Sequence, residues 1–173
     1  MSEPSASTAP GGPLPDEKHI ADFARVQGWL WRGDEPDKAG FEWLQAHGAK
    51  IVVNLRMKDE EKEIHDAAPA LLYIHIGVKN DMPPSDDQAI QWLELCKRCK
   101  AEQIIYVHCR EGHGRTSTFC ALVRIAQGWS ADAAIHDQLP FGFRPDEQHK
   151  LQAEYLRDFA RRKQAGLLKV PAL

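Results

Sequence analysis

The chain has 173 residues, a length that suits one domain built around a single core. Hydrophobic residues make up 43% and charged residues 27% of the chain, which are ordinary proportions for a globular protein. The net charge of -3 provides no overall basic field for binding nucleic acid or an acidic membrane surface. No apolar run approaches the length needed to cross a bilayer, so we expect no integral membrane segment.

The N-terminal stretch MSEPSASTAPGGPLPD is rich in Ser, Ala, Pro and Gly and can bury little apolar surface. We therefore expect residues 1–16 to form a disordered tail and residues 17–173 to form a single domain. The stretch has neither a basic region nor an apolar region of the kind found in secretory signals.

Strand-like and helix-like segments alternate along the chain from Val26 onward. Aromatic or β-branched runs predict strands at 28–33, 50–56, 71–78 and 104–109. Apolar residues at helical spacing predict helices at 37–48, around 91–100, at 115–127, at 130–138 with Ser130 as its cap, and at 146–163. Strands separated by helices predict an α/β fold with a central, mostly parallel sheet and helices on both faces.

The stretch HCREGHGRTS, residues 108–117, follows the apolar run IIYV and precedes a predicted helix. Ligands of open α/β sheets bind at the carboxyl ends of strands, and this stretch lies at such an end. Gly112 and Gly114 let the backbone turn tightly with its amide hydrogens pointing inward. The positive end of the helix and the planar guanidinium of Arg115 complete a predicted site for a phosphate-sized anion.

The same positive field predicts a reactive thiolate at Cys109. Helix N-termini and nearby cations lower a cysteine pKa from about 8.5 to roughly 3.5–7.5. We expect Cys109 to be ionised at neutral pH and able to attack phosphorus, with the Thr116 hydroxyl donating a hydrogen bond to the sulfur. The alternative is a buried, inert thiol at a strand end. The glycines and Arg115 favour the nucleophile.

This stretch resembles the signature loop of the cysteine-dependent protein tyrosine phosphatase superfamily: His-Cys, five residues, Arg, then Thr or Ser. GWLWRGDEP followed by GFEWLQAHGAKIVVNLR looks like the opening of the small dual-specificity-like members. The resemblance runs from about Val26 to about Phe159, and the large tyrosine-specific members need a longer domain. It implies a sheet of four or five strands with helices on both sides, a phosphocysteine intermediate, no metal and no other cofactor.

Such a mechanism needs a general acid, and the candidates are Asp81, Asp86 and Asp87. Asp81 lies in a loop stiffened by the prolines at 83–84. The acid of the superfamily also lies in an Asp-x-Pro-Pro-like loop upstream of the signature. We therefore favour Asp81, with Asp86 next.

Ser85 and Gln88 predict a capping box that opens the helix after this loop. Asp86 and Asp87 then fall in the first helical turn, where a carboxylate complements the helix dipole without taking part in catalysis.

The remaining loop residues are predicted to bind substrate: Arg110, Glu111, Gly112, His113 and Gly114. Arg110 and His113 would make the pocket rim more positive if they face outward. Glu111 would oppose a dianion unless it points away or pairs with an arginine. We expect His108 to orient the loop through a hydrogen bond. Gln148 lies in a segment similar to one that positions water in some branches, or else it is a solvated helix position.

Other candidate features have simpler interpretations. Cys96 and Cys99 form C-x-x-C, but no further zinc ligands follow at close spacing, so core packing is favoured. Cys120 is expected in the core, with pairing to oxidised Cys109 as the alternative. Arg56 supports either a substrate or a carboxylate of the fold. None of the four cysteines lies in a disulfide-dense pattern, which predicts free thiols and a reducing, cytoplasmic setting.

Together these features predict a phosphomonoester phosphatase, with a monomer favoured. Phosphotyrosine proteins, with or without phosphoserine and phosphothreonine, are the first substrate class. A phosphoinositide or inositol phosphate is the second, because loop residues like Arg110 and His113 occur in lipid-directed branches and GRTSTF resembles the inositol-phosphate-directed branch. Two rivals are a non-catalytic phosphate-binding module and a rhodanese-like sulfur transferase, which also uses a loop cysteine.

Overall fold

The computed structural model describes residues 12–100 and 102–173. Its centre is a five-stranded sheet in the order β1-β2-β5-β3-β4. The strands are β1 (Ala24–Gln27), β2 (Leu30–Gly33), β3 (Ala49–Asn54), β4 (Leu72–His75) and β5 (Ile104–His108). Only the pairing of β1 with β2 is antiparallel, so the prediction of a mostly parallel sheet is confirmed.

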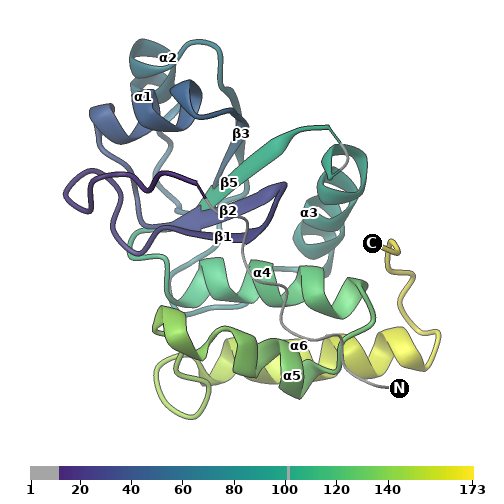
Figure 1. Ribbon diagram of the computed structural model, residues 1–173. Coiled ribbons are helices and arrows are strands. Elements are labelled where there is room, and N and C mark those ends of the chain that lie inside the picture. Colours follow the sequence, from purple (N-terminus) through teal and green to yellow (C-terminus); the bar gives the residue numbers. More distant parts are fainter. Residues whose placement is uncertain (1–11, 101) are drawn as a thin grey trace.

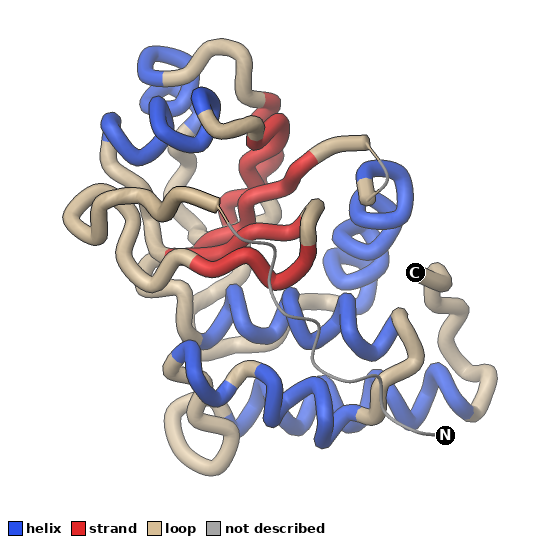
Figure 2. Tube along the Cα trace, in the orientation of Figure 1, coloured by secondary structure: helices blue, strands red, loops and turns tan. Residues whose placement is uncertain are grey.

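Two groups of helices cover the two faces of this sheet (Figure 1). The helices are α1 (Lys38–Ala46), α2 (Glu61–Ala67), α3 (Asp86–Cys99), α4 (Gly114–Ala126), α5 (Ala131–Asp137) and α6 (Lys150–Gln164), with a short 3-10 helix at Leu139–Phe141. Helices α1 and α2 pack on one face, and α3 to α6 lie on the other, as the tube in Figure 2 also shows.

Alternate residues of the central strands serve the two cores. On β3 and β5, Val52 and Tyr106 pack toward α1 and α2, whereas Val53 and Val107 pack toward the opposite group of helices. Side chains alternate between the faces of a strand, so a sheet covered on both sides needs apolar residues at successive positions. This explains the continuous apolar runs in the sequence.

The three central strands of the sheet end side by side. Strand β5 lies between β2 and β3, and its last residue, His108, is opposite Gly33 on β2 and Asn54 on β3. The chain then forms a loop and enters α4, whose 13 residues are all buried. The loop that carries the signature sequence is therefore supported by three strand ends and by the most enclosed helix of the fold.

The sequence prediction missed β1 and α2. Only Val26 is buried on β1 and only Ile64 on α2, so neither segment shows a strong apolar pattern. Strand β4 is shorter than the predicted 71–78. Beyond it the chain still pairs irregularly, with the Ile76 amide donating to the Asn54 carbonyl at 2.9 Å.

Helix boundaries differ most at the C-terminal helix, which begins at Lys150 rather than at residue 146. The Glu147 and His149 amides both donate to the Arg144 carbonyl, which forms turns ahead of the helix. The predicted cap of α5 is confirmed, since the Ser130 hydroxyl accepts from the Ala133 amide at 3.1 Å.

The predicted tail is only partly described. Residues 1–11 lie outside the described residues, and the Arg25 guanidinium donates to the Pro13 carbonyl at 2.6 Å. Among the helices described here, none is long and apolar enough to cross a membrane.

Candidate active site

A pocket at the carboxyl end of β5 brings together most of the residues singled out from the sequence. Its lining residues are Asn80, Asp81, Cys109, Arg110, Glu111, His113, Gly114, Arg115, Gln148 and His149. They come from the acid-bearing loop before α3, from the signature loop and from the segment before α6. Thr116 lies directly behind the pocket, in the first turn of α4.

The Cys109 sulfur is held by hydrogen bonds although it is only 3% exposed. The Thr116 hydroxyl donates to it at 3.0 Å. Burial alone would raise the pKa of Cys109, but the hydroxyl and amide of Thr116, the charge of Arg115 and the amide of Gly112 together hold that pKa below its ordinary value. The pocket therefore stabilises the thiolate form of this sulfur despite its burial.

Arg115 has a buried donor that no described residue satisfies. Its Nη1 donates to the Val78 carbonyl at 2.9 Å, which fixes one end of the guanidinium against the acid-bearing loop. Its Nε atom is buried without a hydrogen-bond partner. An unpaired buried donor costs free energy, so this arginine is suited to an anion that enters the pocket.

Glycine is required at two positions of the loop. Gly112 has φ +75°, and a Cβ atom there would lie 2.7 Å from the Gly33 carbonyl oxygen. A Cβ atom on Gly114 would lie 2.7 Å from Cδ2 of His149. The first glycine lets the loop close against β2, and the second makes room for a histidine at the pocket edge.

Arg32 supports the loop from below and was not identified from the sequence. It is completely buried on β2 and donates through Nη2 to the Gly112 carbonyl at 2.5 Å and to the Ser117 hydroxyl at 3.0 Å. Its Nη1 donates to the Gln138 side chain. An arginine inside a strand that is otherwise apolar was the available signal, because a buried arginine needs several acceptors.

His108 and Glu60 form a second support. The predicted hydrogen bond from His108 to the loop is present, with Nδ1 2.8 Å from the Cys109 carbonyl oxygen. The other ring nitrogen contacts the buried Glu60 carboxylate at the start of α2. Burial would lower the pKa of His108, but Glu60 raises it above its ordinary value. Glu60 was missed because α2 itself was missed.

Asp81 and Asp86 occupy different environments. Asp81 lies in the pocket with φ +61°, a conformation that Asp tolerates better than most residues, and its Oδ1 accepts from Gln148 Nε2 at 3.0 Å. Asp86 is held by both terminal nitrogens of Arg162, at 2.7 and 2.9 Å, and by the Tyr155 hydroxyl. Asp87 is exposed on α3. The predicted Ser85–Gln88 capping box, which separated these residues, is confirmed.

His149 also lines the pocket and was not singled out from the sequence. It is 2% exposed, and its ring stacks on Phe143 with 5.3 Å between centroids. Its Nε2 lies 3.9 Å from Asp81 Oδ1. It follows Gln148 in the chain, and a turn rather than the expected helix directs it into the pocket.

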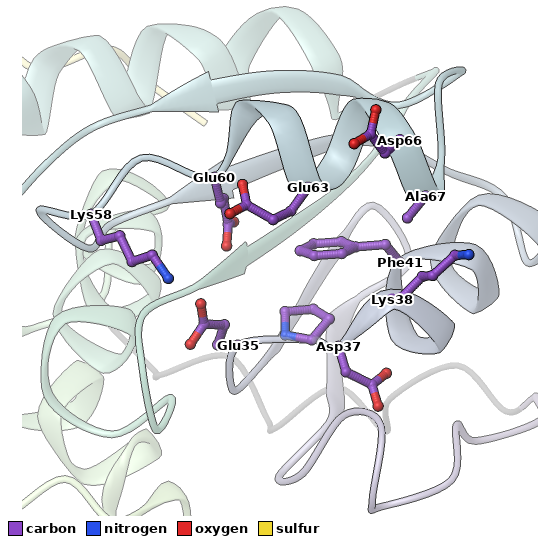
Figure 3. A pocket seen from close by; sticks show the side chains of 10 residues that line it. Glu35, Asp37, Lys38, Phe41, Lys58, Glu60, Glu63, Asp66 and Ala67 are labelled. Atoms are coloured by element: carbon purple, nitrogen blue, oxygen red, sulfur yellow. The ribbon is translucent and has the colours of Figure 1, made fainter.

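A larger hollow of about 290 Å³ lies between α1 and α2, and its lining is mainly acidic, with five carboxylates and two lysines. Figure 3 shows the Phe41 ring within it, near the carboxylates of Glu35, Glu60 and Glu63. Carboxylates repel a dianion, so the smaller pocket at Cys109 is the candidate phosphate site.

The other residues singled out from the sequence lie outside the pocket. Cys96, Cys99 and Cys120 are free thiols in the core, so the core-packing interpretation of C-x-x-C is confirmed. Arg56 forms an ion pair with Glu35, 2.5 Å apart, as its non-catalytic alternative predicted. Within residues 12–100 and 102–173, no group of three His, Cys, Asp or Glu side chains is placed to hold a metal ion.

Comparisons with known proteins agree with this geometry. Residues 15–158 match the family described as DSP-PTPase phosphatase fused to NAD+ kinase. A probable chloroplastic NAD kinase 2 of Oryza sativa subsp. japonica is 31% identical over 118 residues, which cover 64% of this chain and 11% of that protein. The dual specificity protein phosphatase TpbA of Pseudomonas aeruginosa is 26% identical over 135 residues, which cover 77% of this chain and 60% of TpbA. The chain thus matches only part of the length of these curated relatives.

Solved structures show the same fold. The crystal structure of TpbA from P. aeruginosa superposes with a TM-score of 0.70 at 23% identity, covering 88% of this chain and 94% of TpbA. The core catalytic domain of the PP-IP phosphatase SIW14 from S. cerevisiae, in complex with citrate, superposes with a TM-score of 0.67 at 19% identity, covering 86% and 95%. The resemblance noted in the signature loop is confirmed: the chain belongs to the DSP-PTPase family that is fused to NAD+ kinase, within the small dual-specificity-like branch of the cysteine-dependent protein tyrosine phosphatase superfamily.

Proposed function

We propose that the chain hydrolyses phosphomonoesters through a phosphocysteine intermediate. The observation that carries this proposal is the pocket in which a sulfur of lowered pKa, Cys109, lies beside a buried arginine with an unpaired donor, Arg115. Asp81 lines the same pocket. These are the nucleophile, the anion-binding group and the acid that phosphoryl transfer requires.

In the first step the Cys109 thiolate attacks phosphorus, and the bond from phosphorus to the leaving oxygen breaks. Arg115 and the inward loop amides bind the phosphoryl oxygens as their charge redistributes. Asp81 donates its proton to the leaving oxygen, so the product departs as a neutral alcohol or phenol. Phosphorus is then covalently bound to the sulfur.

In the second step water attacks the phosphocysteine, and Asp81 now accepts the proton of that water. The S–P bond breaks, inorganic phosphate forms and the thiolate is restored. The Thr116 hydroxyl favours this departure because its hydrogen bond stabilises the sulfur as an anion. Gln148 contacts Asp81 directly, which places it close to any water that Asp81 activates.

The rim of the pocket favours a phosphoprotein over an inositol polyphosphate. A hollow beside the signature loop is lined by Ala21, Asp22, Asp34, Glu35, Arg110, Glu111 and His113. This lining has four carboxylates, of which Glu35 is paired with Arg56, against one arginine and one histidine. The exposed side chains of Glu111 and Asp22 lie 3.6 and 3.3 Å from the His113 ring nitrogens. A ligand with several phosphates meets repulsion at this rim, whereas a phosphotyrosine peptide with basic neighbours meets attraction.

The proposal also concerns the setting of the protein. Cys109 must stay reduced to attack phosphorus, which fits a reducing compartment such as the cytoplasm.

The function is tested by phosphate release from a panel of substrates: phosphotyrosine, phosphoserine and phosphothreonine peptides and inositol polyphosphates. We expect the wild type to release phosphate and Cys109→Ser to release none above background, while the variant still binds phosphotyrosine peptide because the loop amides and Arg115 remain. A wild type that binds the peptide without releasing phosphate would instead identify a phosphate-binding module, and thiocyanate formation from thiosulfate and cyanide would identify a sulfur transferase.

Asp81→Asn and Asp86→Asn form a matched pair that tests the acid. Asparagine keeps the size of the side chain and also tolerates the positive φ of Asp81. We expect Asp81→Asn to lower kcat/KM for phosphotyrosine peptide by about 10²–10⁴-fold, the usual contribution of acid–base assistance. Asp86→Asn should stay within about threefold of the wild type, because it alters an ion pair with Arg162 and a hydrogen bond with Tyr155 outside the pocket. The reverse ranking would contradict the assignment of Asp81.

Substrate preference tests the acidic rim. The wild type should prefer a phosphotyrosine peptide flanked by lysines to the same peptide flanked by glutamates by about tenfold or more at low salt. Burial raises the pKa of Asp34 to about 6, so the rim is most negative above that pH and the preference should weaken below it.

Glu111→Gln should reduce the preference for the lysine-flanked peptide over the glutamate-flanked peptide, and added salt should reduce it further. Asp132→Asn, a change on the exposed surface of α5, is the control that should leave the ratio unchanged. A wild type that prefers inositol hexakisphosphate to the lysine-flanked peptide would contradict the phosphoprotein assignment.

A further inference from the structure

His149 faces the proposed acid but has no role in the mechanism described above. Its ring is fixed on three sides. It stacks on Phe143 at an interplanar angle of 3°, the space over Gly114 accommodates its edge, and Nδ1 accepts a hydrogen bond from the Arg144 amide at 2.8 Å. A histidine ring buried this completely has one defined orientation.

The hydrogen bond at Nδ1 determines where the ring proton lies. Because Nδ1 accepts from a backbone amide, the proton of the neutral ring is on Nε2. Burial lowers the pKa of His149, so the ring is neutral at physiological pH. The Nε2–H group lines the same pocket as Cys109 and Asp81. His149 therefore presents a single, fixed hydrogen-bond donor to the reaction site.

The side chains of Gln148 and His149 both approach the same oxygen of Asp81. Gln148 Nε2 donates to Asp81 Oδ1 at 3.0 Å, and His149 Nε2 lies 3.9 Å from the same oxygen. The second distance exceeds that of a hydrogen bond. The Asp81 side chain is half-exposed, and hydrogen bonds at catalytic sites often tighten only when substrate is bound.

We propose that His149 is a positioning residue that works through Asp81, an inference that rests on the proposed phosphatase function. His149 and Gln148 together hold Oδ1 in the substrate complex. An oxygen that accepts two hydrogen bonds does not carry the acidic proton, so the proton resides on Oδ2. In the first step it passes from Oδ2 to the leaving oxygen, and in the second step Oδ2 takes a proton from the attacking water.

This role makes a prediction that depends on the leaving group. An acid is needed most when the leaving oxygen is strongly basic, as in phenyl phosphate, and least for dinitrophenyl phosphate, whose phenolate leaves readily. A residue that only supports the loop would affect both substrates equally, because attack by Cys109 is common to both. The ratio of the two kcat/KM values therefore reports on the acid alone.

Two variants distinguish the effect of losing the Nε2–H donor from the effect of losing the aromatic ring. His149→Phe keeps an aromatic ring that can stack on Phe143 but removes the Nε2–H donor, together with the Nδ1 acceptor of the Arg144 amide. His149→Gln loses the ring but can place an amide N–H near the position of Nε2. The exposed His65 on α2 provides the control variant His65→Phe. Thermal denaturation verifies that each variant is folded before its kinetics are compared.

We expect His149→Phe to lower kcat/KM by about 10- to 100-fold for phenyl phosphate, the size of effect that a misplaced catalytic group produces. For dinitrophenyl phosphate the loss should be below about threefold, and His149→Gln should recover part of the phenyl phosphate rate. In an Asp81→Asn background, His149→Phe should cause no further loss, because two residues that act through one proton transfer are not additive.

Each outcome decides between distinct conclusions. Equal losses for the two substrates, or a further loss in the Asp81→Asn background, would overturn the role of His149 while leaving the phosphatase function intact. A folded wild type that hydrolyses neither substrate would overturn the proposed function itself, and this inference with it.

Discussion

The burial of the Cys109 sulfur among hydrogen-bond donors is the constraint on which the rest of this structure depends. Transfer of a charge out of water into a protein costs on the order of several kcal/mol, even after the protein relaxes. Cys109 receives hydrogen bonds from the Thr116 hydroxyl, the Thr116 amide and the Gly112 amide. Hydrogen bonds to charged groups contribute about 1.5–3 kcal/mol each, so three of them match that cost. The charge of Arg115 adds to them, so the pKa of this buried thiol lies below its ordinary value rather than above it.

The donors around the sulfur can act only if the loop is rigid. The carbonyl of Gly112 is tied to Arg32 on β2, and that of Cys109 to His108, which itself contacts Glu60. These bonds hold the carbonyls outward, which leaves the amides of the loop free to face the pocket. Removal of either support would leave the other partner buried and unpaired, an expensive state in a medium of low dielectric. The supports therefore matter as much as the groups that contact substrate.

The parts of the site that are encoded in one continuous stretch were predictable from the sequence. Cys109, Arg115 and the two glycines lie within a single loop, and the position of this loop after an apolar strand predicts an anion-binding site. Asp81 was separable from Asp86 because a capping box fixes where α3 begins, and such boxes are local features. The central strands were predictable for a related reason: a sheet covered on both faces leaves an unbroken apolar run.

The parts that escaped prediction depend on contacts between distant segments. Arg32 looks like an ordinary polar residue of a strand until β2 is placed beside β5. Glu60 has meaning only through His108, and its helix α2 buries a single residue. His149 was assigned to a regular helix, whereas a turn around Arg144 directs its ring into the pocket. Apart from the signal of an arginine in an otherwise apolar strand, none of these features has a local pattern, because each is defined by its partner in the folded chain.

Titration of the Cys109 thiol is the most direct measurement of the central claim. The rate of alkylation by iodoacetamide, followed against pH on the folded protein, reports the fraction of thiolate. Burial raises the pKa of Cys96, Cys99 and Cys120, so these three thiols should be alkylated slowly. Their contribution is measured in the Cys109→Ser variant and subtracted. A lowered pKa of Cys109 predicts a midpoint below the ordinary cysteine value in the wild type and a higher midpoint in Thr116→Val. A wild-type midpoint at or above that ordinary value, unchanged by Thr116→Val, would contradict it.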